Sequence, residues 1–254
     1  MIALITGGSS GIGLSIAKRL KELGYNIILV ARDIEKLEKA KLEVGENTEV
    51  IALDISSLKN CKELYKQVKD KDIDIVVNSA GFGLYGKFLE QNIEEQLDMI
   101  DLNVKTTQII TKLFLTDFKE KNHGYILNIA STAAFSPGPL MACYFATKAY
   151  VLRLTEAISE EIRQEKSRVY VGCLCPGPVD THFNDKLSVQ FSKAQNSDEL
   201  ATYAVQKMFQ RKTVIIPTWK HKLNTFFNKF VPTKILLRAN YNIQIKKINN
   251  TKKE

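Results

Sequence analysis

Short apolar stretches alternate with longer amphipathic ones along most of the chain. The short stretches are rich in β-branched residues and predict seven strands, at 2–5, 26–30, 50–53, 73–78, 125–129, 169–174 and 213–216. Apolar residues at helical spacing predict helices near 12–23, 34–44, 57–69, 94–120, 143–163 and 198–210. Nearly continuous apolar strands separated by helices are typical of a parallel sheet covered on both faces. The pattern therefore predicts one doubly wound α/β domain, whose ligands bind at the carboxyl ends of the strands.

The composition is typical of a globular protein in a reducing compartment. The 254 residues suit a single domain, and 44% of them are hydrophobic. No apolar run approaches the ~20 residues of a membrane span, and Met1 leads directly into a strand-like stretch rather than a signal segment. Cys173 and Cys175 alternate along a predicted strand, which is a core pattern and not a zinc site. We therefore expect a cytoplasmic protein without a bound metal.

Positive charge is concentrated at the C-terminal end. Residues 211–254 hold eleven Lys or Arg and one acid, whereas the preceding 210 residues hold 25 basic and 27 acidic side chains. No recognition motif accompanies the basic segment, so nucleic-acid binding is not expected. We expect a main domain over 1–217, an amphipathic helical extension of it over 218–239, and a flexible basic tail over 240–254.

The first predicted strand runs directly into a glycine-rich turn. The turn reads Thr6-Gly7-Gly8-Ser9-Ser10-Gly11-Ile12-Gly13, and a helix begins within it. Glycines let the backbone approach a pyrophosphate closely, and a helix N-terminus offers unpaired amides to it. The spacing differs from the standard G-x-G-x-x-G, and an ordinary Gly/Ser turn is the alternative. The place of the turn, after the first strand, favours a Rossmann-type dinucleotide site.

The end of the second predicted strand indicates which dinucleotide to expect. Ala31 stands where an acid often binds the adenosine ribose, and Arg32 follows it. Arginine pairs well with the oxygens of a 2′-phosphate. Asp33 could bind the ribose, but capping the next helix is the favoured role. Asp54 could accept a hydrogen bond from the adenine amino group, or it could be only a turn residue. The sequence thus favours NADP(H) over NAD(H).

Tyr144 and Lys148 are the strongest candidates for acid–base chemistry. They stand four residues apart on a predicted helix, which places phenol and ammonium on one face, and Ser131 precedes Tyr144 by thirteen residues. A nearby positive charge favours the phenolate and lowers the pKa of a tyrosine from its usual value near 10. The alternative is that this spacing occurs by chance.

Taken in order, these motifs and three others resemble the short-chain dehydrogenase/reductase family from about residue 2 to residue 217. The further motifs are Asn78-Ser79-Ala80-Gly81, Leu102-Asn103-Val104 and Pro176-Gly177-Pro178-Val179-Asp180-Thr181. Each motif is weak alone. Their common order and matching spacings make the resemblance specific.

The resemblance implies an enzyme that transfers a hydride between NADP(H) and a ketone or secondary alcohol. Ser131 and Tyr144 would hold the carbonyl oxygen, with Tyr144 as general acid or base. Lys148 would bind the nicotinamide ribose and lower the Tyr144 pKa. Asn103 would anchor a water for proton relay, unless it is an ordinary polar helix residue. The implied cofactor-binding residues are Gly7, Ser9, Ser10, Gly11, Ile12, Gly13, Arg32, Asp54, Ile55, Asn78, Ala80, Gly81, Tyr144, Lys148, Pro176, Gly177, Val179 and Thr181.

Two departures from the family pattern narrow the implied activity. Ser79 replaces the usual second asparagine, and the last strand ends in Ile216-Pro217-Thr218-Trp219 instead of a Val-Asp-Gly-Gly closure. The ending is similar to the subgroup with hydroxysteroid dehydrogenases and ketone reductases. The resemblance also implies a homodimer or homotetramer. The alternatives are a membrane-surface ketoacyl or lipid reductase, and a non-catalytic protein that senses dinucleotides.

An apolar group of residues is expected around the reacting carbonyl. The group comprises Phe82, Leu84, Ala133, Phe135, Leu140, Met141 and Val179. It predicts a small hydrophobic substrate that is steroid-, lipid- or acyl-like, although each residue could instead only pack in the core. The polar segment 182–197 lies where a mobile lid is common.

The C-terminal extension carries an apolar stripe at helical spacing that is flanked by lysines and ended by Pro232. The stripe consists of Trp219, Leu223, Phe226, Phe227 and Phe230. Such a helix could cover the substrate mouth, form an oligomer contact, or lie on an anionic membrane surface. Because most amphipathic helices face a core, packing is favoured over membrane contact.

Overall fold

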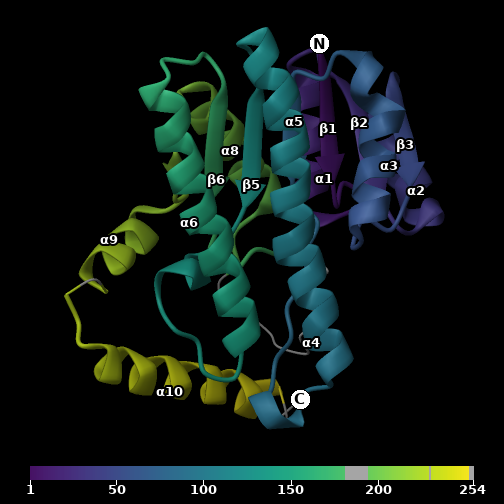
Figure 1. Ribbon diagram of the computed structural model, residues 1–254. Helices are drawn as coiled ribbons and strands as arrows, with labels where there is room; N and C mark the ends of the chain where they lie inside the picture. The colour runs from purple at the N-terminus through teal and green to yellow at the C-terminus, as the bar shows by residue number, and fades with distance from the viewer. Residues whose placement is uncertain (181–193, 229, 252–254) are drawn as a thin grey trace.

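The computed structural model describes residues 1–180, 194–228 and 230–251. Within these ranges, seven parallel strands form one sheet in the order β3-β2-β1-β4-β5-β6-β7 (Figure 1). The strands are β1 Ile2–Thr6, β2 Asn26–Ala31, β3 Thr48–Ala52, β4 Ile75–Asn78, β5 Tyr125–Ile129, β6 Tyr170–Leu174 and β7 Val214–Ile215. The predicted doubly wound parallel sheet is confirmed.

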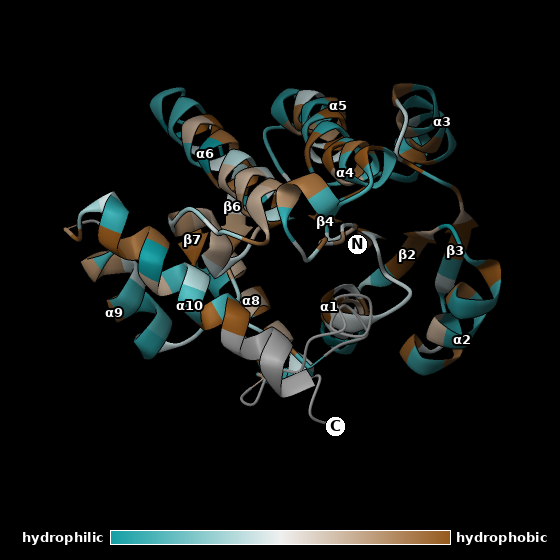
Figure 2. Cartoon of the chain, turned by 90° about the horizontal axis from the view of Figure 1, so that it is seen from below, coloured by the Kyte–Doolittle hydropathy of each residue, from teal (hydrophilic) through white to brown (hydrophobic). Residues whose placement is uncertain are grey.

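Helices cover both faces of the sheet, as Figure 2 shows from below. The helices of one face are α1 Gly11–Glu22, α2 Ile34–Val44 and α8 Ser197–Phe209, and those of the other are α3 Leu58–Val68, α5 Thr107–Lys121 and α6 Ala142–Gln164. In β1, Ala3 and Ile5 pack in the first layer, whereas Leu4 packs in the second. Successive side chains of a strand point to opposite faces, and both faces are covered by helices. Apolar residues are therefore needed at every position, which is why the strands are continuous apolar runs in the sequence.

The long helix predicted over 94–120 is interrupted. α4 (Ile93–Ile100) and α5 are joined by a π-helical turn, Asp101–Thr106, which contains Asn103. The Thr106 hydroxyl donates to the carbonyl of Ile55 at 2.6 Å, which ties this turn to the loop after β3. Single π-helical turns inside α-helices occur frequently at functional sites.

The strand order reverses at β1, which pairs with β2 on one side and β4 on the other. The Thr6 hydroxyl at the end of β1 accepts the backbone N–H groups of Ser79 and Ala80 at 3.2 and 3.3 Å. The loops after β1 and β4 are thus held together at the carboxyl edge. In open α/β sheets, ligands bind in the crevice at such a reversal point.

Two C-terminal helices follow β7: α9 (Trp219–Phe227) and α10 (Thr233–Thr251). α10 lies across the carboxyl edge of the sheet in Figure 1. The Tyr85 hydroxyl donates to the Gln244 carbonyl at 2.5 Å, and Asn240 Nδ2 donates to the Pro137 carbonyl at 2.8 Å. α10 includes residues 240–251, where the sequence predicts a flexible tail. Across the described ranges, none of the helices has the length and apolar character needed to cross a membrane.

Candidate active site

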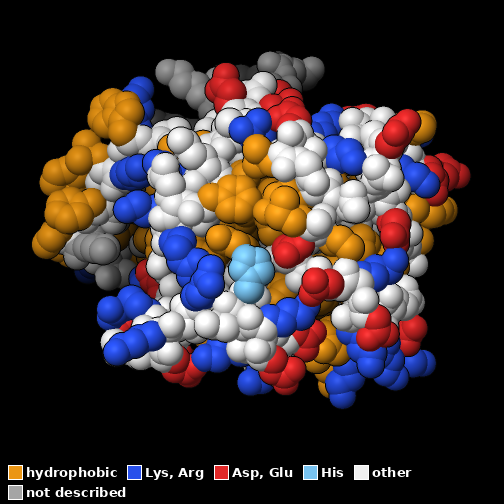
Figure 3. Space-filling model, turned by 90° about the horizontal axis from the view of Figure 1, so that it is seen from above, with side chains coloured by type: hydrophobic (Ala, Val, Ile, Leu, Met, Phe, Trp, Pro, Cys, Tyr) orange, Lys and Arg blue, Asp and Glu red, His pale blue; other side chains and the backbone are white. Residues whose placement is uncertain are grey.

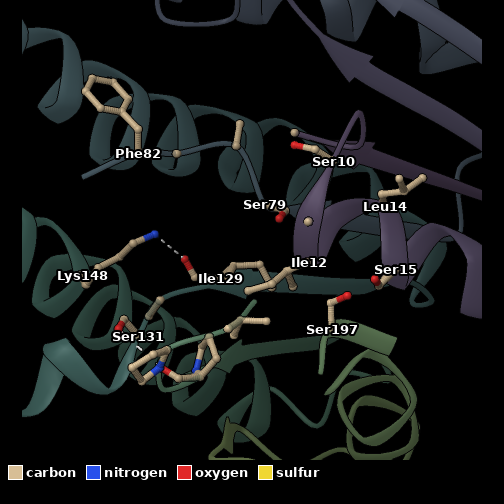
Figure 4. A pocket seen from close by; sticks show the side chains of 18 of the residues that line it. Ser10, Ile12, Leu14, Ser15, Ser79, Phe82, Ile129, Ser131, Lys148 and Ser197 are labelled. Atoms are coloured by element: carbon tan, nitrogen blue, oxygen red, sulfur yellow. Dashed lines mark hydrogen bonds between the residues drawn. The ribbon is translucent and has the colours of Figure 1, made fainter. Parts of the chain in front are cut away.

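A cavity of about 1440 Å³ extends along the carboxyl edge of the sheet. It is lined by the loops after β1 to β6 and by residues of α6, α9 and α10. In Figure 4, Ser10 and Ser15 lie toward one end of the cavity and Ser131 and Lys148 toward the other. The volume exceeds the ~300–1,000 Å³ of a typical small-ligand site. It suits a dinucleotide together with a second small molecule.

Close backbone contacts shape the glycine-rich end of the cavity. Gly7 has φ +66°, and a Cβ there would lie 2.7 Å from the backbone of Ala80. A Cβ on Gly13 would lie 2.4 Å from the Gly7 carbonyl oxygen. The N-cap residue Ser10 makes no side-chain capping hydrogen bond, so its hydroxyl does not occupy the amides at the start of α1. This end therefore presents a helix N-terminus and close-set backbone, which suits a phosphate group.

The loops after β2 and β3 form the adjoining part of the cavity. Arg32 is exposed there, and it makes no ion pair or hydrogen bond with the residues that the structure describes. Asp33 caps α2 by accepting the Lys36 N–H at 3.1 Å, which agrees with the role favoured from sequence. Asp54 accepts the Ser56 N–H at 3.0 Å and also lines the cavity. Arg32 thus remains available to an anionic ligand group, whereas Asp33 is engaged by its own helix.

The end of the cavity opposite the glycine-rich turn brings together Ser131, Tyr144 and Lys148. Ser131 follows β5 and is fixed by accepting the Ala133 N–H at 3.1 Å. Tyr144, in the first turn of α6, forms a hydrogen bond with the Ser131 side chain. Lys148 lies one turn further along α6, is only 7% exposed, and donates from Nζ to the Ile129 carbonyl at 2.9 Å (Figure 4). All three line the same cavity.

Burial is the main cause of the pKa shifts of the Tyr144 phenol and the Lys148 ammonium. It raises the pKa of Tyr144 to about 12, and the hydrogen bond with Ser131 offsets part of that rise. It lowers the pKa of Lys148 to about 8. The Lys148 Nζ lies 5.8 Å from the centroid of the Tyr144 ring. The lowering of the Tyr144 pKa that we expected from Lys148 is wrong for this arrangement, because burial raises that pKa and the lowering contribution comes from Ser131 instead. The phenol is therefore protonated at neutral pH.

Asn103 is buried behind the cavity rather than in its wall. Its side-chain oxygen accepts the Phe82 N–H at 3.0 Å, and its Nδ2 donates to the Phe82 carbonyl at 2.9 Å and to the Thr147 hydroxyl at 3.1 Å. The Thr147 hydroxyl in turn donates to the Tyr144 carbonyl at 2.7 Å. Asn103 therefore connects the loop after β4 to the first turn of α6.

Most of the predicted site residues line the cavity. Those that do are Gly7, Ser9, Ser10, Gly11, Ile12, Arg32, Asp54, Ile55, Ala80, Gly81, Phe82, Ser131, Ala133, Met141, Tyr144, Lys148, Pro176, Gly177 and Val179. Thr181 and most of the predicted lid, 182–193, lie outside the described residues.

Several predicted residues lie elsewhere. Asn78, expected at the cofactor, is buried and donates from Nδ2 to Asn128 Oδ1 at 2.8 Å and to the Thr111 hydroxyl at 3.1 Å, so it joins a polar cluster against α5. Gly13 supports the glycine-rich turn from behind. Among the expected substrate residues, those that do not line the cavity are Leu84, Phe135 and Leu140.

A polar stripe on α9 was not expected from the sequence. The cavity is bordered by His221, Asn224, Thr225 and Asn228, which follow the spacing i, i+3, i+4 and i+7 of one helix face. Asn240 and Gln244 of α10 border it as well. The helical spacing of these polar residues was a usable signal. It was masked by the aromatic stripe on the opposite face.

That aromatic stripe faces outward. The exposed fractions of Trp219, Leu223, Phe226, Phe227 and Phe230 lie between 48% and 71%. The favoured interpretation, that this face packs on the core, is therefore wrong. α9 borders the cavity with its polar face instead.

Comparison with known proteins agrees with this geometry. The sequence matches the short chain dehydrogenase family over residues 1–191. It is 34% identical over 209 residues to an uncharacterized oxidoreductase of Staphylococcus epidermidis, and the match covers 80% of this chain and 90% of the relative. A short-chain dehydrogenase from Sphingobium yanoikuyae in complex with NADPH has a TM-score of 0.80 at 28% identity, covering 86% of this chain and 88% of that one.

A second solved structure is the bulky-bulky ketone specific alcohol dehydrogenase from Comamonas testosteroni. It has a TM-score of 0.78 at 27% identity and covers 90% of this chain and 91% of its own. Both dinucleotides occur among such structures, since a ketoacyl reductase from Brucella melitensis is complexed with NADH. The fold and its solved neighbours place the chain in the class of Rossmann-like oxidoreductases. Within that class, the chain belongs to the short-chain dehydrogenase family.

Proposed function

We propose that this protein is an NADP(H)-dependent oxidoreductase that interconverts a hydrophobic ketone and its secondary alcohol. The observation that carries the proposal is the meeting of Ser131, Tyr144 and Lys148 at one end of a cavity whose other end is the glycine-rich turn. A proton donor, a second hydroxyl and a buried cation at one place form the equipment for acid–base chemistry on a carbonyl oxygen.

The residues along the cavity fit a dinucleotide. The Gly7 position admits no Cβ, which leaves room for close approach to the backbone, and the start of α1 suits the pyrophosphate. Arg32 suits a 2′-phosphate, and Asp54 would lie toward the adenine. Pro176 and Gly177 would border the nicotinamide end. When bound, the cofactor would supply or accept the hydride.

The chain's own groups would handle the oxygen and the proton. The Tyr144 and Ser131 hydroxyls would both donate hydrogen bonds to the carbonyl oxygen and so stabilise the charge that develops there. Tyr144, protonated because burial raises its pKa, would donate its proton to that oxygen during reduction. Lys148 would hold a ribose hydroxyl while its Nζ stays fixed on the Ile129 carbonyl. Asn103 would act as a positioning residue through Thr147 and Phe82.

The cavity walls favour an amphiphilic substrate. Phe82, Ala133 and Met141 supply an apolar wall next to Tyr144, whereas Asn228 and Asn240 supply amide groups on the side of α9 and α10. An apolar ketone with a second, hydrogen-bonding group would match both walls. Steroid-, lipid- and acyl-like ketones belong to this class.

A substrate screen tests the proposal. Oxidation of NADPH and of NADH would be followed by the absorbance of the reduced nicotinamide, with apolar ketones that carry or lack a distal hydroxyl or amide as substrates. We expect turnover with NADPH and bulky ketones, and a loss of roughly 10²–10⁴-fold in kcat for Tyr144→Phe. Tyr150→Phe, a change on the exposed outer side of the same helix, is the matched control and should retain activity. Undiminished turnover of Tyr144→Phe would contradict the assignment.

A further inference from the structure

The outer face of α9 exposes a cluster of large apolar side chains beside the cavity. Phe226 and Phe227 are 53% and 54% exposed, whereas the core residues Phe114 and Phe118 are each only 1% exposed. The Phe226 ring centroid lies 5.7 Å from that of Phe227 and 5.4 Å from that of Phe230. The rings therefore contact one another while remaining open to solvent. Exposed apolar clusters of this kind mark sites of interaction.

Basic residues flank this cluster along the chain, and acids are missing from the same segment. Lys220 and Lys222 lie on α9, and Lys234 and Arg238 lie on α10. On α9, the Lys220 Nζ lies 5.8 Å from the centroid of the Trp219 ring, whereas Lys222 donates to the Tyr203 hydroxyl at 3.1 Å. Between residues 211 and 253 the sequence contains no Asp or Glu. Figure 3 shows hydrophobic side chains together with Lys and Arg at the left margin, where α9 lies. The surface is therefore complementary to a partner that is both apolar and anionic.

The position of the cluster relates it to the cavity. The opposite face of the same helix contributes His221, Asn224 and Asn228 to the cavity wall. A surface that contacts the outer face of α9 would thus lie within one helix diameter, about 10–12 Å, of the substrate end.

We infer that the outer face of α9 and of the turn after it, defined by Trp219, Leu223, Phe226, Phe227 and Phe230, binds the surface of an anionic phospholipid membrane. Aromatic rings enter the headgroup region favourably, and lysines beside them meet the lipid phosphates. A second copy of this chain fits less well, because self-pairing of the face would bring the same lysines together without an acid from this segment to neutralise them. The inference does not depend on the proposed reaction.

Vesicle co-sedimentation tests the inference with the full-length protein. We expect recovery with phosphatidylglycerol-containing vesicles, little recovery with pure phosphatidylcholine, and weaker binding at high salt. Phe226→Ser/Phe227→Ser should reduce the partition coefficient by roughly tenfold or more, because two exposed rings are lost. The matched control is Leu42→Ser/Leu58→Ser, which removes exposed apolar side chains from α2 and α3.

A charge variant keeps the test decisive if the serine variant does not fold. Lys220→Glu/Lys222→Glu should lower the partition coefficient on anionic vesicles by about fivefold per lysine, and Lys59→Glu/Lys62→Glu on α3 should not. Equal recovery of wild type and the Phe226→Ser/Phe227→Ser variant, or no vesicle binding by wild type, would overturn the inference. Light scattering tests whether a second copy of this chain covers the face instead. If wild type is a dimer that does not bind vesicles and Phe226→Ser/Phe227→Ser is a monomer, the face is an interface between copies.

Discussion

At the residue scale, burial gives Lys148 and Tyr144 opposite protonation tendencies. The ammonium of Lys148 is held in a site that raises the free energy of its charged form, and the phenol of Tyr144 is held in its neutral form. A buried cation beside a neutral phenol is costly for stability and useful for chemistry on a carbonyl oxygen. The two effects can be measured separately.

Lys148→Met should stabilise the protein at neutral pH while it abolishes turnover. The folded pKa of about 8 lies below the usual 10.5, so the wild-type lysine destabilises the fold fully below pH 8. That cost, about 3 kcal/mol at most, disappears as pH rises from 8 to 10.5. Urea unfolding of both proteins at several pH values measures it. A stability difference that stays constant between pH 7 and pH 10 would contradict the assignment.

Arg32→Ala should weaken the binding of NADPH but not the binding of NADH. A charge-assisted contact to the 2′-phosphate is worth about 1.5–3 kcal/mol, so KM for NADPH should rise roughly tenfold to a hundredfold, whereas KM for NADH should change little. Arg153→Ala, which alters an exposed arginine on α6, is the control. Equal effects on the two cofactors would show that Arg32 does not read the 2′-phosphate.

Residue-level prediction from sequence succeeded where motif spacing was informative and failed where side-chain direction mattered. Tyr144 and Lys148 share a helix face at any α-helical geometry, so their proximity could be predicted. Asn78 ends β4 next to the cavity loop, but its side chain points to the face covered by α5, where Asn128 and Thr111 hold it. The position of a residue along a strand predicts that it lies at the carboxyl edge of the sheet. The face to which its side chain points becomes known only with the register of the strands and the helix layers.

At the scale of elements, the turn between β1 and α1 depends on backbone packing as much as on ligand contacts. The Gly13 Cα faces the Gly7 carbonyl, and Ser79 lies behind it. Any side chain at residue 13 would clash with the Gly7 carbonyl and so distort the turn itself. Cofactor affinity and local stability are therefore coupled in this element.

Gly13→Ala should lower the free energy of unfolding by about 1–3 kcal/mol and raise KM for NADPH at least roughly tenfold. Gly24→Ala is the matched control, because Gly24 has φ +87° at the other end of α1 but no atom within 4 Å of the added Cβ. It should strain the backbone without altering KM. Urea titration and steady-state kinetics measure both. If Gly13→Ala left KM unchanged, the turn would not shape the cofactor site.

The sequence predicted which elements form but not how the last two are oriented. The seven strands and the covering helices could be predicted because buried parallel sheets impose continuous apolar runs. α9 has one aromatic and one polar face, and the usual preference for burying the aromatic face gave the wrong orientation. The π-helical turn at Asp101–Thr106 also has no apolar signature, since it changes the register of a helix without ending it.

At the scale of the whole molecule, α10 completes the substrate end of the cavity from the far end of the chain. The composition of its later part, from residue 240 onward, is rich in Asn and Lys and predicted a flexible tail. Long-range contacts hold the helix instead: Tyr85 donates to the Gln244 carbonyl, and Asn240 Nδ2 donates to Ser136 Oγ at 3.2 Å and to the Pro137 carbonyl. Local propensity cannot reveal contacts made across more than 100 residues of sequence.

Tyr85→Phe/Asn240→Ala should loosen α10 without unfolding the domain. Loss of these hydrogen bonds removes about 1 kcal/mol each, enough to increase local opening several-fold. Hydrogen exchange followed by mass spectrometry should show faster exchange in residues 233–245 and unchanged exchange in α5. KM for bulky ketones should change while kcat for small ones does not. Unaltered exchange in α10 would mean that other contacts hold it.

The central claim, hydride transfer to a carbonyl carbon with Tyr144 supplying the proton, is tested most directly by isotope transfer. NADPH carrying deuterium at the transferable position of nicotinamide C4, prepared separately for each face of the ring, would be incubated with a ketone that the screen identifies. Mass spectrometry of the alcohol should find the deuterium on the carbinol carbon for one face only, and Tyr144→Phe should form that product at least roughly 10²-fold more slowly. A product without deuterium from either cofactor, or one formed equally fast by Tyr144→Phe, would contradict the claim.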